Sequence, residues 1–134
     1  MINFNSLRKV LVMPIYFVKH YNQRAIRGFS DKDMWSADTF LARQIADILR
    51  WYMEKGHGVP WSYAREDDRF CEDFEYMVAA RNSEYTKYAA LFDEYGRNGH
   101  APNEKWKEMF GGLTDDEVHD MMTWLAEHFT ELWD

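Results

Sequence analysis

The sequence has few of the residues that stabilise small secreted domains or form turn-rich β-sheets. Of its 134 residues, one is cysteine, three are proline and seven are glycine. A single cysteine excludes an intramolecular disulfide and a multi-cysteine metal site, so a reducing cytosol is the simpler compartment. We expect Cys71 itself to pack as a small hydrophobic residue. So few glycines and prolines do not suit an all-β sandwich, and they leave long stretches in which helices can form.

Long hydrophobic runs are also lacking. The N-terminal apolar stretch, residues 10–18, has nine residues including Pro14, which is too short to span a membrane. No small-residue cleavage site follows it, so a secretion signal is not predicted. We expect this stretch to be extended or a short helical segment that packs on the core and is broken at Pro14.

Aromatic side chains and acidic charge are abundant. Aromatic residues make up 17% of the chain, and the net charge is −7. Residues 1–30 contain five lysines and arginines and no acid, whereas residues 31–134 carry a net charge of −12. The basic arm can fold back and neutralise the acidic body, or the body can face a partner protein with a basic surface. A nucleic-acid-binding protein is usually basic, so direct nucleic-acid binding is not predicted.

Helical periodicity dominates from residue 30 onward. Apolar residues recur every three or four positions over residues 35–52, 70–95, 106–110 and 118–132, with an interruption of the second stretch at Asn82-Ser83 left open. We therefore predict an all-α fold, a single compact bundle of about four to six helices. This one domain, 1–134, would comprise a basic N-terminal arm, 1–26, extended or short helical, and an acidic helical body, 27–134.

Helix boundaries are marked by residues with known capping roles. Ser30 with Asp33, and Thr114 with Glu117, have the spacing of capping boxes, in which each residue bonds the backbone of the other. Glycines and a proline mark the helix ends, at Gly56, Gly58, Pro60, Gly111 and Gly112. The start of the first body helix and the start of the last helix are therefore the best-defined boundaries.

Residues 27–42 carry a recognisable pattern, Arg-Gly-Phe-Ser-Asp-Lys-Asp-Met-Trp-Ser-Ala-Asp-Thr-Phe-Leu-Ala. It resembles a signature of small uncharacterised proteins encoded by tailed bacteriophages, which also have a Gly…Pro stop one helix later and a C-terminal Leu-Trp-Asp. This chain has Gly58 and Pro60 and ends in Leu132-Trp133-Asp134. The resemblance implies a phage origin rather than an activity. Residues 61–112 depart from the pattern by being longer and more acidic, which suggests a surface specific to this chain.

Three acids of the signature, Asp31, Asp33 and Asp38, surround Trp35. They do not form a calcium-binding EF-hand loop, which requires glycine where Ser36 stands, and no metal site is predicted. One interpretation is structural: Asp31 and Asp33 cap the helix, Trp35 anchors it, and Asp38 pairs with Arg27 or the helix amides. Trp35→Ala should then destabilise the chain by roughly 3–5 kcal/mol. The other interpretation is a polar ligand site at the Arg27–Asp38 corner.

Enzyme motifs are weak. Glu72 with Glu75, and Glu117 with Asp120, have the i, i+3 spacing of the metal-binding acids in all-α Mg²⁺-dependent nucleotide pyrophosphatases. The two pairs are far apart in the sequence, however, and few lysines that could hold phosphate lie between them. No nucleophile elbow, phosphate-binding glycine loop or useful Cys/His pair occurs. An enzyme is therefore not favoured, and no cofactor is predicted.

The remaining class is a binding protein. The favoured function is docking on a basic surface of a host protein, as an inhibitor of a defence system or a host-takeover factor, by a cytoplasmic monomer or homodimer. Exposed aromatic residues serve as anchors and acids steer association, and the predicted acids are Asp67, Asp68, Glu72 and Asp73. The alternative is a protein that sequesters a nucleotide or signal molecule, with Arg27 contacting phosphate and Trp35 contacting the base.

The fold prediction can be tested by circular dichroism. Because every segment with clear boundaries has a helical period, the far-UV spectrum should show the two helical minima. A spectrum dominated by strand would contradict the all-α prediction.

Overall fold

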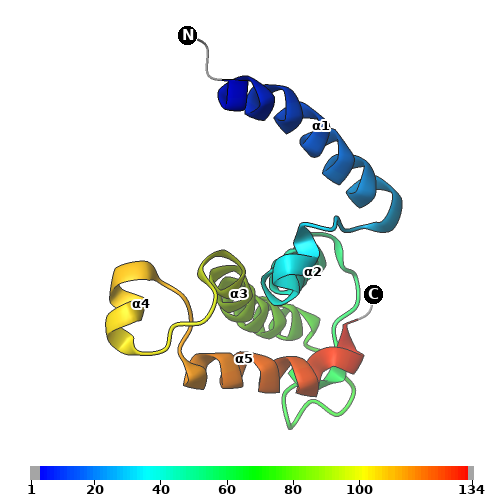
Figure 1. Cartoon of the computed structure of the whole chain (residues 1–134). Helices are drawn as coiled ribbons and strands as arrows, with labels where there is room; N and C mark the ends of the chain where they lie inside the picture. Colours follow the sequence, from blue (N-terminus) through cyan, green and yellow to red (C-terminus); the bar gives the residue numbers. More distant parts are fainter. Residues whose placement is uncertain (1–3, 133–134) are drawn as a thin grey trace. The chain divides into compact units, whose positions relative to one another are not determined.

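The computed structural model describes residues 4–132, with side chains from residue 15 onward, and these residues are all-α (Figure 1). The predicted helical class and helix number are confirmed. The elements are α1 (Phe4–Arg27), η1 (Asp33–Ser36), α2 (Ala37–Lys55), η2 (Trp61–Tyr63), α3 (Phe74–Asn98), α4 (Glu104–Phe110), α5 (Asp115–His128) and η3 (Phe129–Glu131), where η denotes a short 3₁₀ helix. Trp133 and Asp134, which end the phage-like pattern, lie outside the described residues.

The chain divides into two compact units, Met1–Phe40 and Leu41–Asp134. The first contains α1, the turn after it, η1 and the first residues of α2. The second contains the rest of α2 and all later elements. None of the helices in the described part of the chain has the length and apolar character needed to cross a membrane.

The N-terminal arm is one long helix, which corrects the prediction of an extended or short helical segment. α1 continues through position 14 and ends only at Arg27, followed by Gly28 with a left-handed φ of 82°. An internal proline removes one backbone hydrogen bond and often kinks a helix without ending it. The side chains of Ile15, Phe17 and Val18 are exposed, so this part of the apolar stretch is not in a core.

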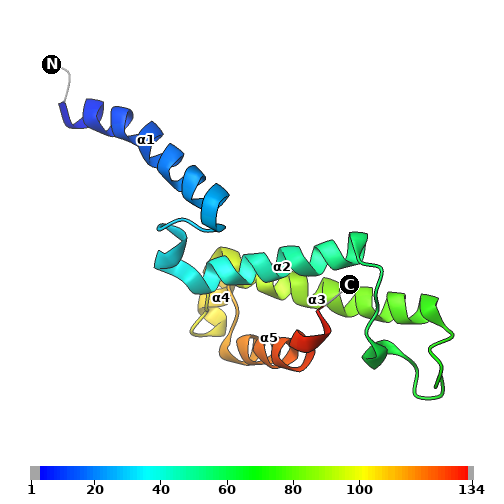
Figure 2. The same ribbon diagram turned by 90° about the vertical axis from the view of Figure 1, so that its right-hand side faces the viewer.

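The second unit is built on α3, with α2 and α5 antiparallel to it (Figures 1 and 2). On one side, Arg50 of α2 pairs with Asp93 of α3 at 3.4 Å. On the other side, the Tyr88 hydroxyl of α3 donates a hydrogen bond to Asp120 of α5. The core contains residues of all three helices and of the connections between them, chiefly Leu49, Tyr63, Met77, Tyr85, Phe92, Leu113, Met121 and Trp124.

Two alanines and a leucine are the buried residues of α2. Ala42, Ala46 and Leu49 are buried, whereas the larger Leu41 and Ile48 are exposed. Residues 42, 46 and 49 follow the helical spacing of four and three, so they lie on one face. Alanine side chains keep the α2 backbone close to its neighbours, and the large apolar residues that suggested the helix are divided between its two faces.

Aromatic rings fill the space between α3 and α5. The indole of Trp124 stacks on Tyr88, with ring centroids 4.4 Å apart, and meets Tyr85 edge to face at 5.8 Å. The His128 ring also stacks on the indole, with ring centroids 4.8 Å apart. The Trp124 Nε1–H donates to the carboxylate of Glu84, so the only polar atom of the buried indole has a partner. This packing uses much of the aromatic content noted in the sequence.

The helix boundaries agree with most of the capping signals. Thr114 and Glu117 form the predicted capping box at the start of α5. α2 ends before Gly56, and α4 ends at Gly111, whose φ is 75°. The interruption left open at Asn82-Ser83 does not occur, because α3 runs unbroken from Phe74 to Asn98. Cys71 packs against the core, as expected.

The packing of α2 can be tested with adjacent residues. Leu49 is fully buried and Ile48 is 46% exposed. We expect Leu49→Ala to lower the free energy of unfolding by about 2–5 kcal/mol, because it leaves a cavity in the core. Ile48→Ala removes the same number of carbon atoms from a partly exposed side chain and should cost less than about 1 kcal/mol. Equal midpoints for the two variants in urea denaturation would contradict this orientation of α2.

Candidate functional site

The turn between α1 and α2 is closed by the carboxylate of Asp33. The Asp33 Oδ2 accepts hydrogen bonds from the Ser30 backbone N–H at 2.7 Å and the Ser30 hydroxyl at 2.9 Å. The Ser30 Oγ in turn accepts from the Asp33 backbone N–H at 3.3 Å. This is the reciprocal bonding of the predicted capping box. Ser30 and Asp33 are both buried, so the turn is fixed from inside.

Arg24 provides the counter-charge for Asp33. Its Nε donates to Oδ2 at 2.9 Å and its Nη2 donates to Oδ1 at 2.6 Å, a two-point contact that fixes the orientation of both groups. The Arg24 hydrogen bond, reinforced by those from Ser30, holds the pKa of Asp33 well below its usual range. Arg24 was not among the residues predicted for this site. Arg24 precedes Arg27 by about one helical turn, which would have placed both side chains near the turn after α1. That inference requires a helix over these residues, and the helix was not predicted.

Asp31 binds the other polar groups near the end of α1. It accepts from the Gln23 side chain at 2.8 Å and from Arg27, and Lys19 lies 3.5 Å away. These contacts, with Gln23 contributing most, lower the pKa of Asp31 to about 2. The Arg27 Nε also donates to the Phe29 carbonyl at 3.0 Å. Arg27 and Asp31 therefore stabilise the turn after α1 by contacts within the chain.

Trp35 does not anchor the helix, which corrects the structural interpretation made from the sequence. Its side chain is 78% exposed. It belongs to η1, and Asp38 lies in the first turn of α2. An exposed ring loses little buried area when it is truncated, so the core-type loss of stability expected for Trp35→Ala has no basis. The hydrogen bonds between Ser30 and Asp33 are present, but they close the turn before η1, whose N-cap residue, Lys32, makes no side-chain capping bond. Asp31 does not cap the helix either, because it accepts from Gln23 and Arg27.

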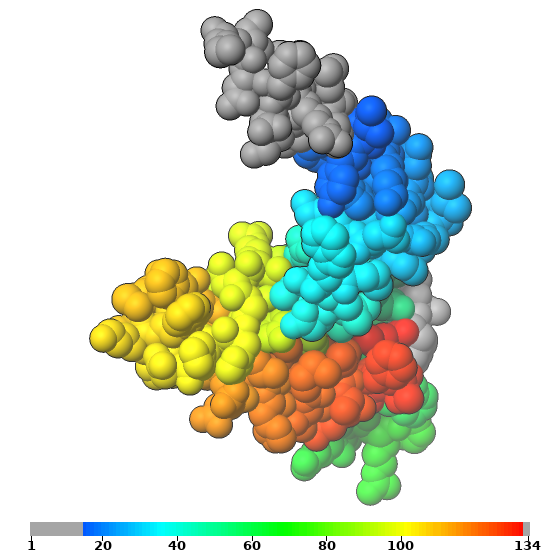
Figure 3. Space-filling model, viewed as in Figure 1, coloured from blue at the N-terminus to red at the C-terminus, as the bar shows by residue number. Residues whose placement is uncertain are grey.

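The second candidate site is the connection from η2 to the start of α3, residues 61–76, which we call the acidic aromatic segment. It contains six acidic residues and two arginines, a net charge of −4. Four aromatic side chains of the segment are exposed, Trp61 (73%), Phe70 (82%), Phe74 (53%) and Tyr76 (40%). In Figure 3 this segment, coloured green, forms the lower margin of the second unit.

Two of the predicted acids determine the shape of the acidic aromatic segment. The carboxylate of Asp68 accepts from the backbone N–H groups of Glu72 at 2.9 Å and Asp73 at 3.0 Å. These bonds lower the pKa of Asp68, that from Asp73 contributing most. They enclose Cys71, whose φ of 52° is in the left-handed region. Asp73 then caps α3 by accepting from the Tyr76 N–H at 3.1 Å.

The other two predicted acids point to solvent. Asp67 and Glu72 are exposed, as are Glu66 and Glu75 of the same segment. Arg65 pairs with Asp73 at 3.5 Å and lies over the Tyr76 ring, 4.2 Å from its centroid. The segment therefore combines acids that hold its backbone with acids that face outward beside exposed rings. Sequence analysis grouped Asp67, Asp68, Glu72 and Asp73 together, and only the structure separates these roles.

The acids considered for a metal-dependent enzyme have other partners. Glu117 accepts from Lys107 and from the Thr114 backbone N–H. Asp120 lies near Lys87 and accepts from Tyr88. Within residues 4–132, no three histidine, cysteine, aspartate or glutamate side chains are grouped so that they could hold a metal ion. The i, i+3 acidic pairs therefore do not gather into one cluster.

Comparison with protein families, with curated proteins and with solved structures gave no match for this chain.

The contact between Asp33 and Arg24 can be tested by Asp33→Asn. The change removes the charge of a buried group that accepts charge-assisted hydrogen bonds, so we expect the first unit to lose about 1–3 kcal/mol. Amide hydrogen exchange at the C-terminal end of α1 and at Ser30 measures this loss. Asp47→Asn, which alters an exposed acid 3.5 Å from Arg50, is the control and should leave the exchange unchanged.

Acid pH should have the same effect on the wild-type chain. The folded-state pKa values of Asp31 and Asp33 are lowered. Their stabilisation is therefore complete above the unfolded-state value of about 4 and is lost as the pH falls through the folded-state values. Protection of the end of α1 should decrease between about pH 4 and pH 2, and the decrease should be smaller in Asp33→Asn. Constant protection in the wild type would contradict this role.

Proposed function

We propose that this chain is a non-enzymatic binding protein that docks on a basic surface of a partner protein through the acidic aromatic segment, residues 61–76. The observation that carries the proposal is the exposure of four aromatic rings, those of Trp61, Phe70, Phe74 and Tyr76, within an acidic segment. Exposed aromatic rings that insert into pockets of a partner are frequent energetic centres of interfaces. The acids around them favour a basic partner over an acidic one.

The fixed backbone of the segment supports this function. Asp68 holds the amides of residues 72 and 73, and Asp73 caps α3, so the backbone that carries Phe70, Phe74 and Tyr76 is preformed. A preformed surface loses less conformational entropy on binding than a flexible loop does. Two acids of the segment, Asp68 and Asp73, bind backbone amides, and the other four are exposed.

The proposed partner is a protein of the host cell. The resemblance of residues 27–42 to a signature of tailed-phage proteins suggests a phage accessory protein, such as an inhibitor of a defence system or a host-takeover factor. Its place of action would then be the host cytoplasm. A surface with a net charge of −4 suits a basic site, such as the site of a nucleic-acid-binding host protein.

The docking surface can be tested by affinity purification from host cells, followed by mass spectrometry and measurement of binding rates with the purified partner. We expect Phe70→Ala to weaken binding by about 2 kcal/mol or more if the ring is an anchor. Phe129→Ala, which truncates a ring that is 67% exposed on η3, is the matched control and should bind normally. Equal losses in both variants, or no loss in Phe70→Ala, would contradict docking through this segment.

The charge contribution requires a variant that leaves the structural acids intact. Asp67→Asn with Glu72→Gln removes two outward-facing charges and should slow association more than it speeds dissociation, because peripheral charges mainly set the association rate. Glu108→Gln with Glu127→Gln removes two exposed charges elsewhere and is the control. Association of the wild type should also slow as salt rises. Salt-independent association would contradict electrostatic steering.

A further inference from the structure

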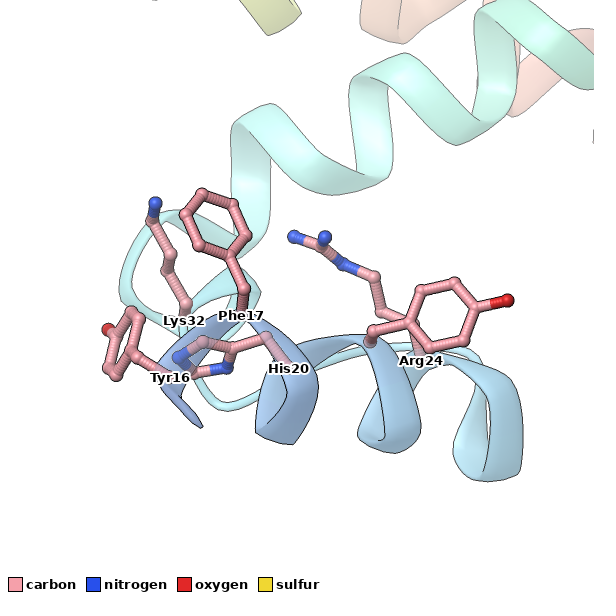
Figure 4. Close-up of a pocket in the computed structure, with 6 residues that line it drawn as sticks. Tyr16, Phe17, His20, Arg24 and Lys32 are labelled. Carbon is pink, nitrogen blue, oxygen red and sulfur yellow. The ribbon is translucent and has the colours of Figure 1, made fainter. Parts of the chain in front are cut away.

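The first unit contains a cavity of about 370 Å³ that none of the sequence predictions used. Most of its wall comes from one face of α1, where residues follow each other at the helical spacing of four, and the rest comes from the turn after α1. In Figure 4 the ring of Phe17 and the guanidinium of Arg24 extend to the same side of the helix, and His20 lies between them along it. The lining residues are Tyr16, Phe17, His20, Tyr21, Arg24 and Lys32.

His20 is the unusual residue of this cavity. It is 6% exposed, and neither of its buried ring nitrogens has a hydrogen-bond partner in the described part of the chain. The only aromatic contact of its ring there is with Tyr16, edge to face at 4.1 Å. A neutral imidazole has one N–H donor and one nitrogen acceptor, and leaving both unsatisfied in a buried position costs free energy. A ligand that supplies a polar partner would remove that cost.

The charge of the cavity selects the sign of the ligand. Two cations, Arg24 and Lys32, line the cavity, and none of the lining residues is an acid. Arg24 uses its Nε and one Nη for Asp33 and retains further N–H groups. Lys32 has no carboxylate partner among the described residues, and the acid that precedes it, Asp31, is bound by other groups. An anion is therefore the matching ligand.

The remaining walls favour a flat ring. Tyr16, Phe17 and Tyr21 are three of its six lining residues. Planar groups pack on such side chains in stacked or edge-to-face geometry. The volume is near the lower end of the range for small-molecule sites, about 300–1,000 Å³, so the ligand is small.

We propose that this cavity binds a small aromatic anion. The ring packs against Tyr16 and Phe17, the anionic group contacts Arg24 and Lys32, and a polar group of the ligand bonds His20 after a small rotation of the side chains that cover it. A nucleoside monophosphate and an aromatic carboxylate share this chemistry. The site differs from the Arg27 and Trp35 contacts predicted from the sequence, since neither residue lines the cavity. It is also independent of docking by residues 61–76.

Titration calorimetry of the full chain tests the proposal with four probes. Adenosine 5′-monophosphate and indole-3-acetate each combine a ring with an anion, whereas adenosine and inorganic phosphate each have one of the two features. The proposal is supported if the monophosphate or indole-3-acetate binds more tightly than both adenosine and phosphate. Which of the two binds more tightly then shows whether the site prefers a phosphate or a carboxylate. Equal binding of phosphate or adenosine, or no binding of any probe, would overturn it.

Substitutions locate the binding. Lys32→Gln should weaken it roughly tenfold, the usual value of one charge-assisted hydrogen bond. Lys19→Gln removes an exposed lysine 3.5 Å from Asp31 that does not line the cavity, and it should bind like the wild type. Equal weakening by the two substitutions would show only general attraction to a basic surface and would overturn the proposal.

His20→Phe tests the buried imidazole while keeping a ring beside Tyr16. It should also weaken binding roughly tenfold, and the helix content by circular dichroism shows whether the variant is folded. In the wild type, the imidazole resonances that are missing from His20→Phe should shift on addition of the ligand. If binding occurs and these resonances do not shift, the ligand lies elsewhere and the proposal fails. This NMR readout holds even if His20→Phe does not fold, because the resonances can be assigned by sequence-specific methods.

Discussion

Carboxylates that accept hydrogen bonds from backbone N–H groups hold the turns of this chain. Asp33 holds the turn that precedes α2, and Asp68 and Asp73 hold the turn that precedes α3. Glu117, in the first turn of α5, holds the backbone N–H of Thr114 just before that helix. Glu94 closes the loop around α4 by accepting from the Gly112 N–H at 2.7 Å. A chain with seven glycines and three prolines has few residues that form turns by backbone preference, and its acids take over part of that role.

This use of acids changes how the net charge is interpreted. Of the acids in the acidic aromatic segment, Asp68 and Asp73 bind backbone amides, while Asp67 and Glu72 face solvent. The structural acids are bound within the chain, so they have fewer sites left for a partner. The same distinction holds at the turn after α1, where Asp33 is buried and neutralised by Arg24. The negative charge available to a partner is therefore smaller than the net charge of the chain suggests. It is carried by the outward-facing acids, such as Asp67 and Glu72.

The elements predicted well were those whose signals are local in sequence. The Thr114 capping box and the glycines at 111–112 involve neighbouring residues, and they correctly bound α4 and α5. One error was local, because the arm expected to break at Pro14 is the continuous helix α1. The other concerns tertiary environment. Trp35 was placed inside because it is large and apolar, whereas its side chain on η1 is exposed; on α2, likewise, Leu49 is buried and Leu41 is exposed. The choice between two faces of a helix depends on the neighbours, which the periodicity of one helix does not specify.

The same limit applies to the candidate sites. The spacing of Ser30 and Asp33 predicted their hydrogen bonds, but Arg24, nine residues before Asp33, could be found only once α1 was known to be a helix. The cavity depends on that helix in the same way. Neither His20 nor Lys32 belongs to a sequence motif. His20 lines the cavity because α1 brings residues 16, 20 and 24 to one face, and Lys32 lines it because the turn after α1 returns to that helix.

The distribution of tryptophans has an optical consequence. Among the described tryptophans, Trp124 is buried in a stack of rings, whereas the others are exposed: Trp35, Trp51, Trp61 and Trp106. Because these indoles are partly or largely in water, their emission wavelength should change little on unfolding. The near-ultraviolet dichroism of the rigid Trp124 stack should instead disappear on unfolding. The two signals thus report on different parts of the molecule, the emission on its surface and the dichroism on the contact between α3 and α5.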